Sequence, residues 1–426
     1  MKAILVILDG LADRAQAELD NKTPLEAANT PHLNYLCSKA ETGIMIPYRQ
    51  GIPMGTETAH FILFGYNLED FPGRGAIEAL GEGAVLREDE VYLRTCFSFV
   101  EKGSALGDGF RVKNRYTREL TTGEIMELAE SLPPSIKGIS IKWKHSFDVH
   151  GILTLRGDRI SSSISDSDPF SAGKHVMKIE PFESAREDAL FTAKLLNDFL
   201  VKSYETLKNH PVNINREIHG KEPANFILTK WAGHKAEIPD FSEKHGMTSL
   251  MIGASGLLKG LAKYLGMDFI KCADFEQAVR QALQANHDFI HVHTKEPDDA
   301  AHTKNPANKV KVIEELDRAL KPLLENEETF KDDTLLVITA DHSTPSSGTM
   351  IHSGEPVPIM FLGKGIRFDD VSSFGERSCT KGSIRMQGFD LMPMILSITD
   401  RGLLYGLRQG GKRKMYVPDE GNPLLP

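Results

Sequence analysis

The chain has 426 residues, of which 40% are hydrophobic and 26% charged, so it is long enough for two domains and too apolar to be disordered. Its net charge of −9, with acidic and basic residues interspersed, argues against nucleic acid as a partner. The four cysteines form no CxxC pair, which indicates a reducing compartment, and no segment approaches the roughly 20 apolar residues that cross a bilayer. We expect a cytoplasmic protein with no membrane partner; the sequence leaves its oligomeric state open.

Alternating strands and helices predict a doubly wound α/β sheet. Short apolar runs, each followed by polar residues rather than by a hairpin turn, predict buried parallel strands at 3–10, 287–294 and 333–343. Amphipathic patterns predict helices at 255–266, 274–286 and 308–326.

The middle of the chain has a different pattern. Short alternating segments such as "VYLRTCFSFV" and "GILTLRGDRI" are followed by a long amphipathic pattern at 184–210 and a strand-like run at 224–233. We expect a smaller α+β domain at 89–239, inserted into an α/β domain formed by 1–88 and 240–426. The Gly- and Pro-rich end, 408–426, is predicted to be a surface tail.

Acids and histidines follow the predicted strands. Because ligands bind beyond the carboxyl ends of strands in an open α/β sheet, we expect them to converge on one edge. One helical turn would place two of them, Asp298 and His302, on one face. A single aspartate after a strand is commonly only a cap or turn residue; the whole set in this order predicts a metal centre. The set is Asp9, Asp298, His302, Asp341, His342 and His352.

The chemistry of these side chains favours two divalent metal ions. Carboxylates with imidazoles suit Mn²⁺ or Zn²⁺, with Mg²⁺ or Co²⁺ as alternatives. Six ligands divide into two sites of about three each, and two metals about 4 Å apart are a standard device for phosphoryl transfer.

The segment "GTETAHFILFGY" predicts a short helix with Thr56 at its N-cap and Gly65 near its C-cap. A helix N-terminus favours phosphate, and a hydroxyl held against a divalent metal becomes a nucleophile. Thr56 could instead serve only as a helix cap. Beside six predicted metal ligands, the role of nucleophile is favoured.

The chain resembles a known family along nearly its whole length. The segments "ILDGLADR", "GTETAHFILFGY", "GRGAIEALGEG", "SISDSDP", "EPDDAAHT" and "TADHSTPSSGTMIHSGEPVPIMF" are similar, in order, to the archaeal-type cofactor-independent phosphoglycerate mutases. These enzymes belong to the alkaline phosphatase superfamily. The resemblance implies a phosphatase-like metal-binding domain, an inserted substrate-binding domain, two Mn²⁺ or Zn²⁺ ions, a phospho-enzyme intermediate and no 2,3-bisphosphoglycerate.

The resemblance also implies how the site residues divide. Asp9, Asp341 and His342 would hold one metal together with the nucleophile, and Asp298, His302 and His352 would hold the other. The family's nucleophile is a serine four residues before a histidine. Thr56, four residues before His60, takes its place here.

Departures from the family pattern fall where substrate would be held. The family's arginine cluster keeps only Arg115 and Arg118 around Tyr116, and Trp231 stands in place of a glycine. The histidine of its "DTDPH" pattern is Phe170, and Cys96 and Phe99 replace an asparagine and a threonine. Arg115, Arg118 and Lys259 are the candidate anion-binding residues; each could alternatively be a surface charge.

We expect a glycolytic isomerase that interconverts 3-phosphoglycerate and 2-phosphoglycerate through phospho-Thr56. The altered substrate pocket leaves a second hypothesis open, another phosphotransferase such as a homoserine-kinase-like enzyme, or a phosphate-ester hydrolase on the same core. An inactive metal-binding relative is the third, and the complete ligand set argues against it. In each active case the partner is a small phosphorylated metabolite.

Overall fold

The computed structural model describes residues 1–103, 108–182, 186–326 and 333–402. The chain forms two units. The larger unit comprises Met1–Phe71 and Ile238–Pro426, and the smaller unit is Pro72–Glu237. The predicted tail at 408–426 and the first residues of the helix predicted at 184–210 lie outside the described residues.

The larger unit is built on a mixed sheet in the order β10-β9-β11-β1-β12-β13-β2-β14. Its strands are β1 (Lys2–Leu8), β2 (Glu41–Ile46), β9 (Ser249–Gly253), β10 (Asp268–Lys271), β11 (Phe289–Thr294), β12 (Thr334–Thr339), β13 (Val357–Leu362) and β14 (Ile384–Gln387). The three predicted strands, β1, β11 and β12, are parallel neighbours, while β13 runs antiparallel between β12 and β2.

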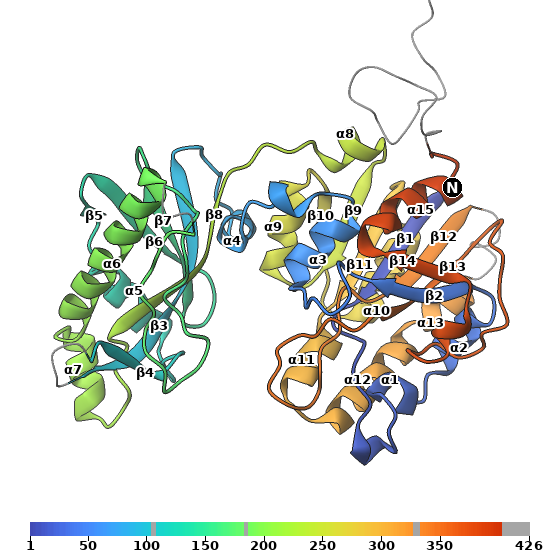
Figure 1. The fold of residues 1–426 in the computed structure, drawn as a ribbon, viewed down its shortest axis with the longest axis horizontal. Coiled ribbons are helices and arrows are strands. Elements are labelled where there is room, and N and C mark those ends of the chain that lie inside the picture. Colours follow the sequence, from blue (N-terminus) through green and yellow to red (C-terminus); the bar gives the residue numbers. More distant parts are fainter. Residues whose placement is uncertain (104–107, 183–185, 327–332, 403–426) are drawn as a thin grey trace, which may run out of the picture. The chain divides into compact units, whose positions relative to one another are not determined.

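Helices cover both faces of this sheet, which is why its central strands are continuous apolar runs (Figure 1). The chain passes from β9 through α9 to β10, then crosses back through α10 to β11, so right-handed connections place α9 and α10 on opposite faces. The predicted doubly wound α/β fold is confirmed. The helices are α1 (Pro24–Ala27), α2 (Pro31–Cys37), α3 (Thr56–Leu63), α8 (Phe241–His245), α9 (Gly256–Tyr264), α10 (Phe275–Gln284), α11 (Glu296–His302), α12 (Pro306–Ala319), α13 (Lys321–Glu325) and α15 (Leu391–Ile398), with 3-10 turns η1 (Ala17–Leu19), η2 (Leu68–Asp70), η3 (Cys379–Lys381) and η4 (Gly388–Asp390).

Two local expectations need correction. The helix predicted at 308–326 is two helices, because the chain breaks after Ala319 and restarts with Pro322 in the first turn of α13. The inserted unit was expected to begin at 89, but the unit begins at Pro72, because α4 (Arg74–Gly81) packs on β3 and β8. Gly75 permits this close approach, since a Cβ there would lie 2.3 Å from the Tyr92 carbonyl oxygen.

The smaller unit is an antiparallel sheet with helices packed on it. Strand β3 (Glu90–Lys102) pairs antiparallel with β4, β7 and β8. The remaining elements are β4 (Phe110–Asn114), β5 (Ser135–Ile136), β6 (Ile139–His145), β7 (His150–Arg156), β8 (Phe226–His234), α5 (Thr122–Glu130), α6 (Glu187–Leu207) and α7 (Pro211–Ile218).

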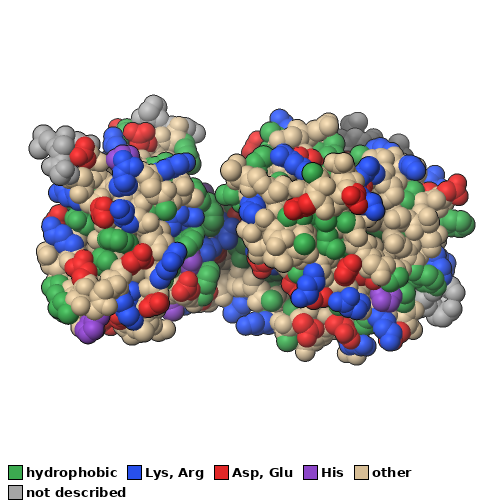
Figure 2. Space-filling model, turned by 90° about the horizontal axis from the view of Figure 1, so that it is seen from below, with side chains coloured by type: hydrophobic (Ala, Val, Ile, Leu, Met, Phe, Trp, Pro, Cys, Tyr) green, Lys and Arg blue, Asp and Glu red, His purple; other side chains and the backbone are tan. Residues whose placement is uncertain are grey.

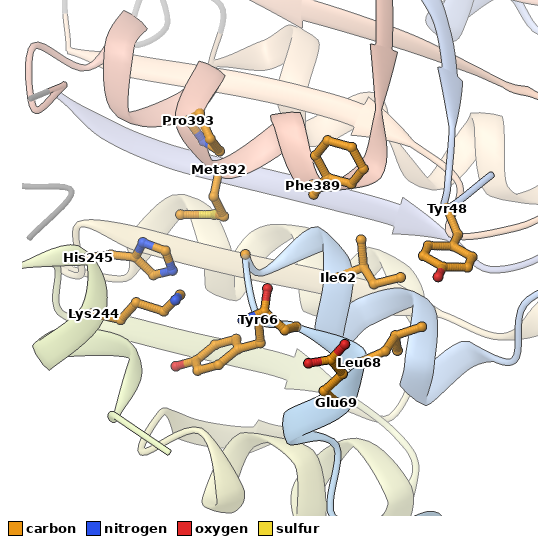
Figure 3. A pocket seen from close by; sticks show the side chains of 12 residues that line it. Tyr48, Ile62, Tyr66, Leu68, Glu69, Lys244, His245, Phe389, Met392 and Pro393 are labelled. Carbon is orange, nitrogen blue, oxygen red and sulfur yellow. The ribbon is translucent and has the colours of Figure 1, made fainter. Parts of the chain in front are cut away.

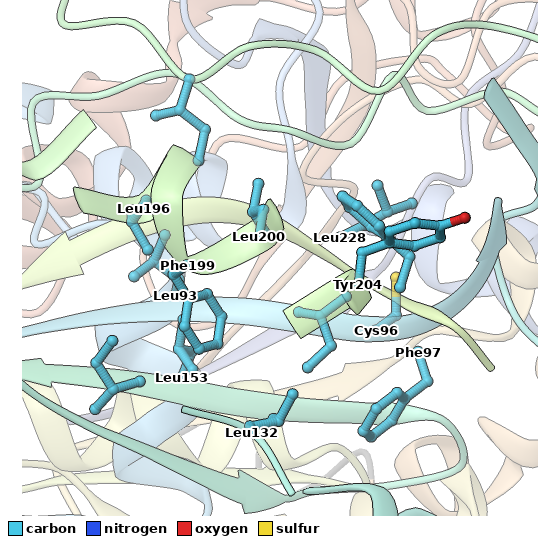
Figure 4. Packing of buried hydrophobic residues seen from close by; sticks show 14 of the residues in the cluster. Leu93, Cys96, Phe97, Leu132, Leu153, Leu196, Phe199, Leu200, Tyr204 and Leu228 are labelled. Atoms are coloured by element: carbon cyan, nitrogen blue, oxygen red, sulfur yellow. The ribbon is translucent and has the colours of Figure 1, made fainter. Parts of the chain in front are cut away.

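One apolar face of α6 forms the core of the smaller unit. Phe199, fully buried, packs with Leu196 and Leu200 over Leu93 of β3 and Leu153 of β7 (Figure 4). The face of the whole chain seen in Figure 2 shows acidic and basic side chains mixed over each unit, as the sequence indicates. None of the described helices is both long and apolar enough to span a membrane.

We expect Phe199→Ala to destabilise the smaller unit by about 3–5 kcal/mol, because it leaves a cavity in a packed core. Both tryptophans of the chain, Trp143 and Trp231, lie in this unit, so urea unfolding followed by tryptophan fluorescence reports on it alone. Leu190→Ala on the same helix is the control, since Leu190 is 47% exposed. Equal losses in the two variants would contradict this packing.

Candidate metal centre and active site

Three neighbouring strand ends carry the site. In the sheet, Leu8 at the end of β1 lies beside Thr294 at the end of β11, and Ile7 lies beside Thr339 at the end of β12. Asp9 therefore emerges next to Asp341 and His342. The parallel register alone brings these side chains to one edge, as expected from the sequence.

The six predicted side chains form two groups. Asp9, Asp341 and His342 make one group, and Asp298, His302 and His352 make the other. Within each group, one possible ligand atom from each residue lies within 4.8 Å of the others. Helix α11 presents Asp298 and His302 one turn apart, and His352 arrives from the segment between β12 and β13, with Nε2 3.3 Å from Asp298 Oδ1.

The two groups adjoin each other. The rings of His342 and His352 stack with centroids 3.9 Å apart. Thr344, which the sequence analysis did not single out, donates a hydrogen bond to Asp298 Oδ1 (2.8 Å), and its Oγ1 lies 3.0 Å from His342 Nδ1. Gly10, at φ +63°, makes room for this contact, because a Cβ there would lie 2.5 Å from Thr344 Oγ1.

The charges of the groups depend strongly on one another. Burial would raise the pKa of Asp9, but Lys295 and the rings of His293 and His342 hold it well below its usual range. Burial and the charge of Asp9 raise the pKa of Asp341 to about 6. Burial would lower the pKa of His342, but Asp341 and Asp9 raise it to about 9. Bringing these carboxylates together therefore requires positive charge among them.

The donor set fits divalent cations. Two completely buried carboxylate oxygens, Asp9 Oδ1 and Asp341 Oδ2, have no hydrogen-bond partner among the described residues, so each retains lone pairs for a cation. Carboxylate oxygens with imidazole nitrogens are ligands for metals such as Zn²⁺ and Mn²⁺.

Thr56 lies against the first group. Its hydroxyl donates to Asp9 Oδ2 (3.1 Å) and lies 3.4 Å from His342 Nε2, and the side chain is buried. The expectation that Thr56 is the N-cap of α3 is wrong, because Gly55 is the N-cap and Thr56 is the first helical residue. The hydroxyl is therefore turned to Asp9 rather than to the helix backbone. His60, one turn on, holds the Thr56 carbonyl oxygen through Nδ1 (2.7 Å).

Strand β11 and the residue directly after it contribute two further residues that sequence reasoning missed. His293 Nε2 lies 3.1 Å from Asp9 Oδ2, and Lys295 Nζ lies 2.7 Å from Asp298 Oδ2 and 3.6 Å from Asp9 Oδ2. The signal was present in "HVHTKEPDD", since both residues stand at the end of a predicted strand.

The smaller unit holds a separate charged cluster. The Arg115 guanidinium contacts both oxygens of Asp168, at 2.9 and 2.6 Å, and Lys230 Nζ lies 2.9 Å from Asp168 Oδ2. Arg118, predicted to act with Arg115, is exposed. Among the described residues, the ion pairs with Asp168 are made by Arg115 and Lys230, not by Arg118. Lys259 lies half-buried on α9 in the larger unit.

Two aromatic residues beside this cluster have unusual backbones. Phe170 and Trp231 both adopt φ +56°, a left-handed conformation that favours glycine and that in bulky residues clusters at functional sites. Trp231 lies where the register between β3 and β8 shifts, next to Lys230. The rings of Phe170 and Trp231 lie 5.3 and 4.9 Å from Lys230 Nζ, which fixes the ammonium in place.

A pocket of about 630 Å³ lies elsewhere on the larger unit (Figure 3). The end of α3, helix α8 and helix α15 line it with Ile62, Tyr66, Lys244, His245 and Met392. None of the predicted site residues lines this pocket, so the pocket is separate from the candidate metal centre.

Glu376, which holds the segment after β1 through hydrogen bonds, provides a pH prediction. Glu376 accepts hydrogen bonds from the Asp13 backbone and the Thr23 hydroxyl, and burial raises its pKa to about 7 from 4.5. The folded chain therefore holds this proton more tightly than the unfolded chain, and its contribution to stability falls as pH rises from about 4.5 to 7. We expect the melting temperature of Glu376→Gln to rise relative to wild type between pH 5 and pH 8. A difference that does not change with pH would contradict this.

Comparison with known proteins finds a matching family model and similar enzymes over nearly the whole chain. The model of the metalloenzyme superfamily matches residues 1–398. The 2,3-bisphosphoglycerate-independent phosphoglycerate mutase 2 of Methanocaldococcus jannaschii is 48% identical over 428 residues, covering 99% of this chain and 98% of that protein. An enzyme named 2,3-bisphosphoglycerate-independent phosphoglycerate mutase from Picrophilus torridus is 36% identical and covers 95% of this chain and 99% of its own.

Solved structures of similar proteins share this fold over nearly the whole chain. The PH0037 protein from Pyrococcus horikoshii aligns with a TM-score of 0.76 at 30% identity, covering 95% of this chain and 99% of that one. The cofactor-independent phosphoglycerate mutase from Thermoplasma acidophilum aligns with a TM-score of 0.64 at 31% identity, covering 94% and 100%.

Proposed function

Since the chain belongs to the 2,3-bisphosphoglycerate-independent phosphoglycerate mutases of the metalloenzyme superfamily, we propose that it interconverts 3-phosphoglycerate and 2-phosphoglycerate. The observation that carries this proposal is the Thr56 hydroxyl, 3.1 Å from Asp9 and beside two groups of metal-ligand side chains.

We assign Asp9, Asp341 and His342 to one divalent ion, with Thr56 as a further ligand, and Asp298, His302 and His352 to the other. Mn²⁺ or Zn²⁺ suits these donors. When bound, the two ions supply charge neutralisation for the transferring phosphoryl group and lower the pKa of the nucleophilic hydroxyl.

In the proposed reaction, Thr56 Oγ attacks the phosphorus of 3-phosphoglycerate. The new Oγ–P bond forms as the bond from phosphorus to the glycerate 3-oxygen breaks. The Thr56 hydroxyl, oriented by its hydrogen bond to Asp9 Oδ2, gives up its proton as it attacks, and the departing glycerate oxygen takes up one proton. The reverse transfer to the 2-oxygen frees Thr56. His60 supports the nucleophile by holding the Thr56 carbonyl from the next turn.

We assign binding of the glycerate carboxylate to the smaller unit, as the resemblance implies. Arg115 is the predicted contact. We assign to Lys230, instead of Arg118, the second contact with this carboxylate. Both cations lie against Asp168, so the cluster keeps a net positive charge while its geometry is fixed. Lys259, in the larger unit, stays a candidate for a phosphate contact.

The experiment is a ³¹P NMR assay of Mn²⁺-loaded protein with 3-phosphoglycerate, run beside hydrolysis of p-nitrophenyl phosphate. The proposal expects 2-phosphoglycerate to appear without free phosphate. Phosphate release with no isomer formed would instead establish a phosphohydrolase. One observation favours that second candidate: Arg118 is exposed and does not join Arg115 at Asp168, so the predicted arginine pair for a carboxylate is incomplete.

A further inference from the structure

Lys295 joins the two metal-ligand groups. It lies directly after β11 and before α11, and its ammonium is 2.7 Å from Asp298 Oδ2 and 3.6 Å from Asp9 Oδ2. Each group thus contributes one carboxylate to this cation. A lysine ammonium cannot itself ligate a metal, so its presence between two metal sites needs another reason.

The ammonium lies on the open side of the centre. The Lys295 side chain is 42% exposed, whereas Asp9 and Asp298 are completely buried. Among the described residues its one recorded hydrogen bond is to Asp298 Oδ2, and an ammonium has three N–H donors. Donors therefore remain for a ligand that arrives from solvent.

The charges in the centre favour an anionic ligand. The groups contain three carboxylates, and two divalent ions would leave a net charge of one positive; Lys295 makes it two positive. A phosphoryl group carries about −1.5 to −2 at neutral pH and would balance this charge. Without such an anion, an ammonium beside two divalent cations would be repelled.

Lys295 and the nucleophile lie beside the same atom. Thr56 Oγ1 is 3.1 Å and Lys295 Nζ is 3.6 Å from Asp9 Oδ2. A phosphoryl group transferred to Thr56 would bring its oxygens into the region that the ammonium faces. Lysine binds phosphate as a point charge, without a fixed orientation, which suits a group that changes geometry during transfer.

We propose that Lys295 is a catalytic residue that binds the phosphoryl group while it passes to and from Thr56. The inference rests on the proposed phosphomutase reaction. Lys295 keeps its proton throughout, and no bond to Nζ is made or broken. A purely structural role is the competing explanation, in which the ammonium only separates the carboxylates of Asp9 and Asp298.

The test is calorimetric titration of Mn²⁺-loaded protein with inorganic phosphate. We expect Lys295→Met to bind two Mn²⁺ ions as wild type does and to bind phosphate at least about tenfold more weakly, because a charge-assisted contact is lost. The matched control is Lys311→Met, on the exposed face of α12, which should leave phosphate affinity unchanged. Unchanged phosphate affinity in Lys295→Met, or loss of its Mn²⁺, would overturn the inference.

A second measurement follows phosphorylation of Thr56 from 3-phosphoglycerate after rapid quenching. Its rate should fall by about 10²–10³-fold in Lys295→Met, as when one stabilising donor is removed from a transition state. Normal phosphorylation in this variant would overturn the inference and leave the mutase function standing. A wild type that makes no 2-phosphoglycerate would instead overturn the proposed function.

Discussion

Thr56→Val is expected to lower phosphoryl transfer by at least about 10⁴-fold while metal binding is retained. Valine keeps the branched shape and the first position of α3 but removes the hydroxyl oxygen that we propose as the nucleophile. Loss of a nucleophile removes the whole covalent pathway, so the effect should exceed that of any single stabilising contact. The measurement is conversion of 3-phosphoglycerate, with bound Mn²⁺ counted by elemental analysis.

Two companion variants make this result specific. Thr56→Ser keeps the hydroxyl and should retain activity within about tenfold. Thr58→Val removes a hydroxyl on the same helix that donates to the Gly55 carbonyl, and should leave activity close to wild type. A fully active Thr56→Val would show that Thr56 is not the nucleophile.

Asp298→Asn is expected to lower bound metal from two ions to one and activity by about 10³-fold or more. The asparagine has the same shape, but it removes the negative charge to which His302, His352 and Lys295 are all directed. An isolated cation site without its carboxylate loses most of its attraction for a divalent ion.

The control is Asp299→Asn, the next residue on α11, whose side chain is exposed. It should keep two ions and normal turnover. If Asp298→Asn kept both ions, the second metal-ligand group would be assigned wrongly. If both variants lost metal equally, the loss would reflect general charge on α11 rather than ligation.

The sequence predicted the centre of the larger sheet because β1, β11 and β12 are covered on both faces and so read as unbroken apolar runs. Edge strands such as β10 and β14 are four residues long and partly exposed, so their pattern is too weak to recognise. The position of α4 depends on backbone contacts with Ala232 and Tyr92, which lie in strands that the local sequence around α4 does not reveal.

The convergence of the predicted ligand side chains could be expected because a strand end fixes where a side chain emerges: Asp9 directly follows β1, and Asp341 is the second residue after β12. Lys295 and Thr344 were not predicted, because an ammonium and a neutral hydroxyl are not usual metal ligands. Arg118 was predicted together with Arg115 because the arginine cluster of the family that the chain resembles falls on this segment. Lys230, which takes its place against Asp168, comes from a strand 62 residues after that aspartate.

The most direct test of this account is where the phosphoryl group goes. Mn²⁺-loaded protein mixed with 3-phosphoglycerate, quenched within one turnover and digested, should contain one phosphorylated peptide, with the phosphate on Thr56. The phosphate should disappear as 2-phosphoglycerate forms. Turnover to 2-phosphoglycerate with no phosphate on Thr56 at any time would contradict the proposed mechanism.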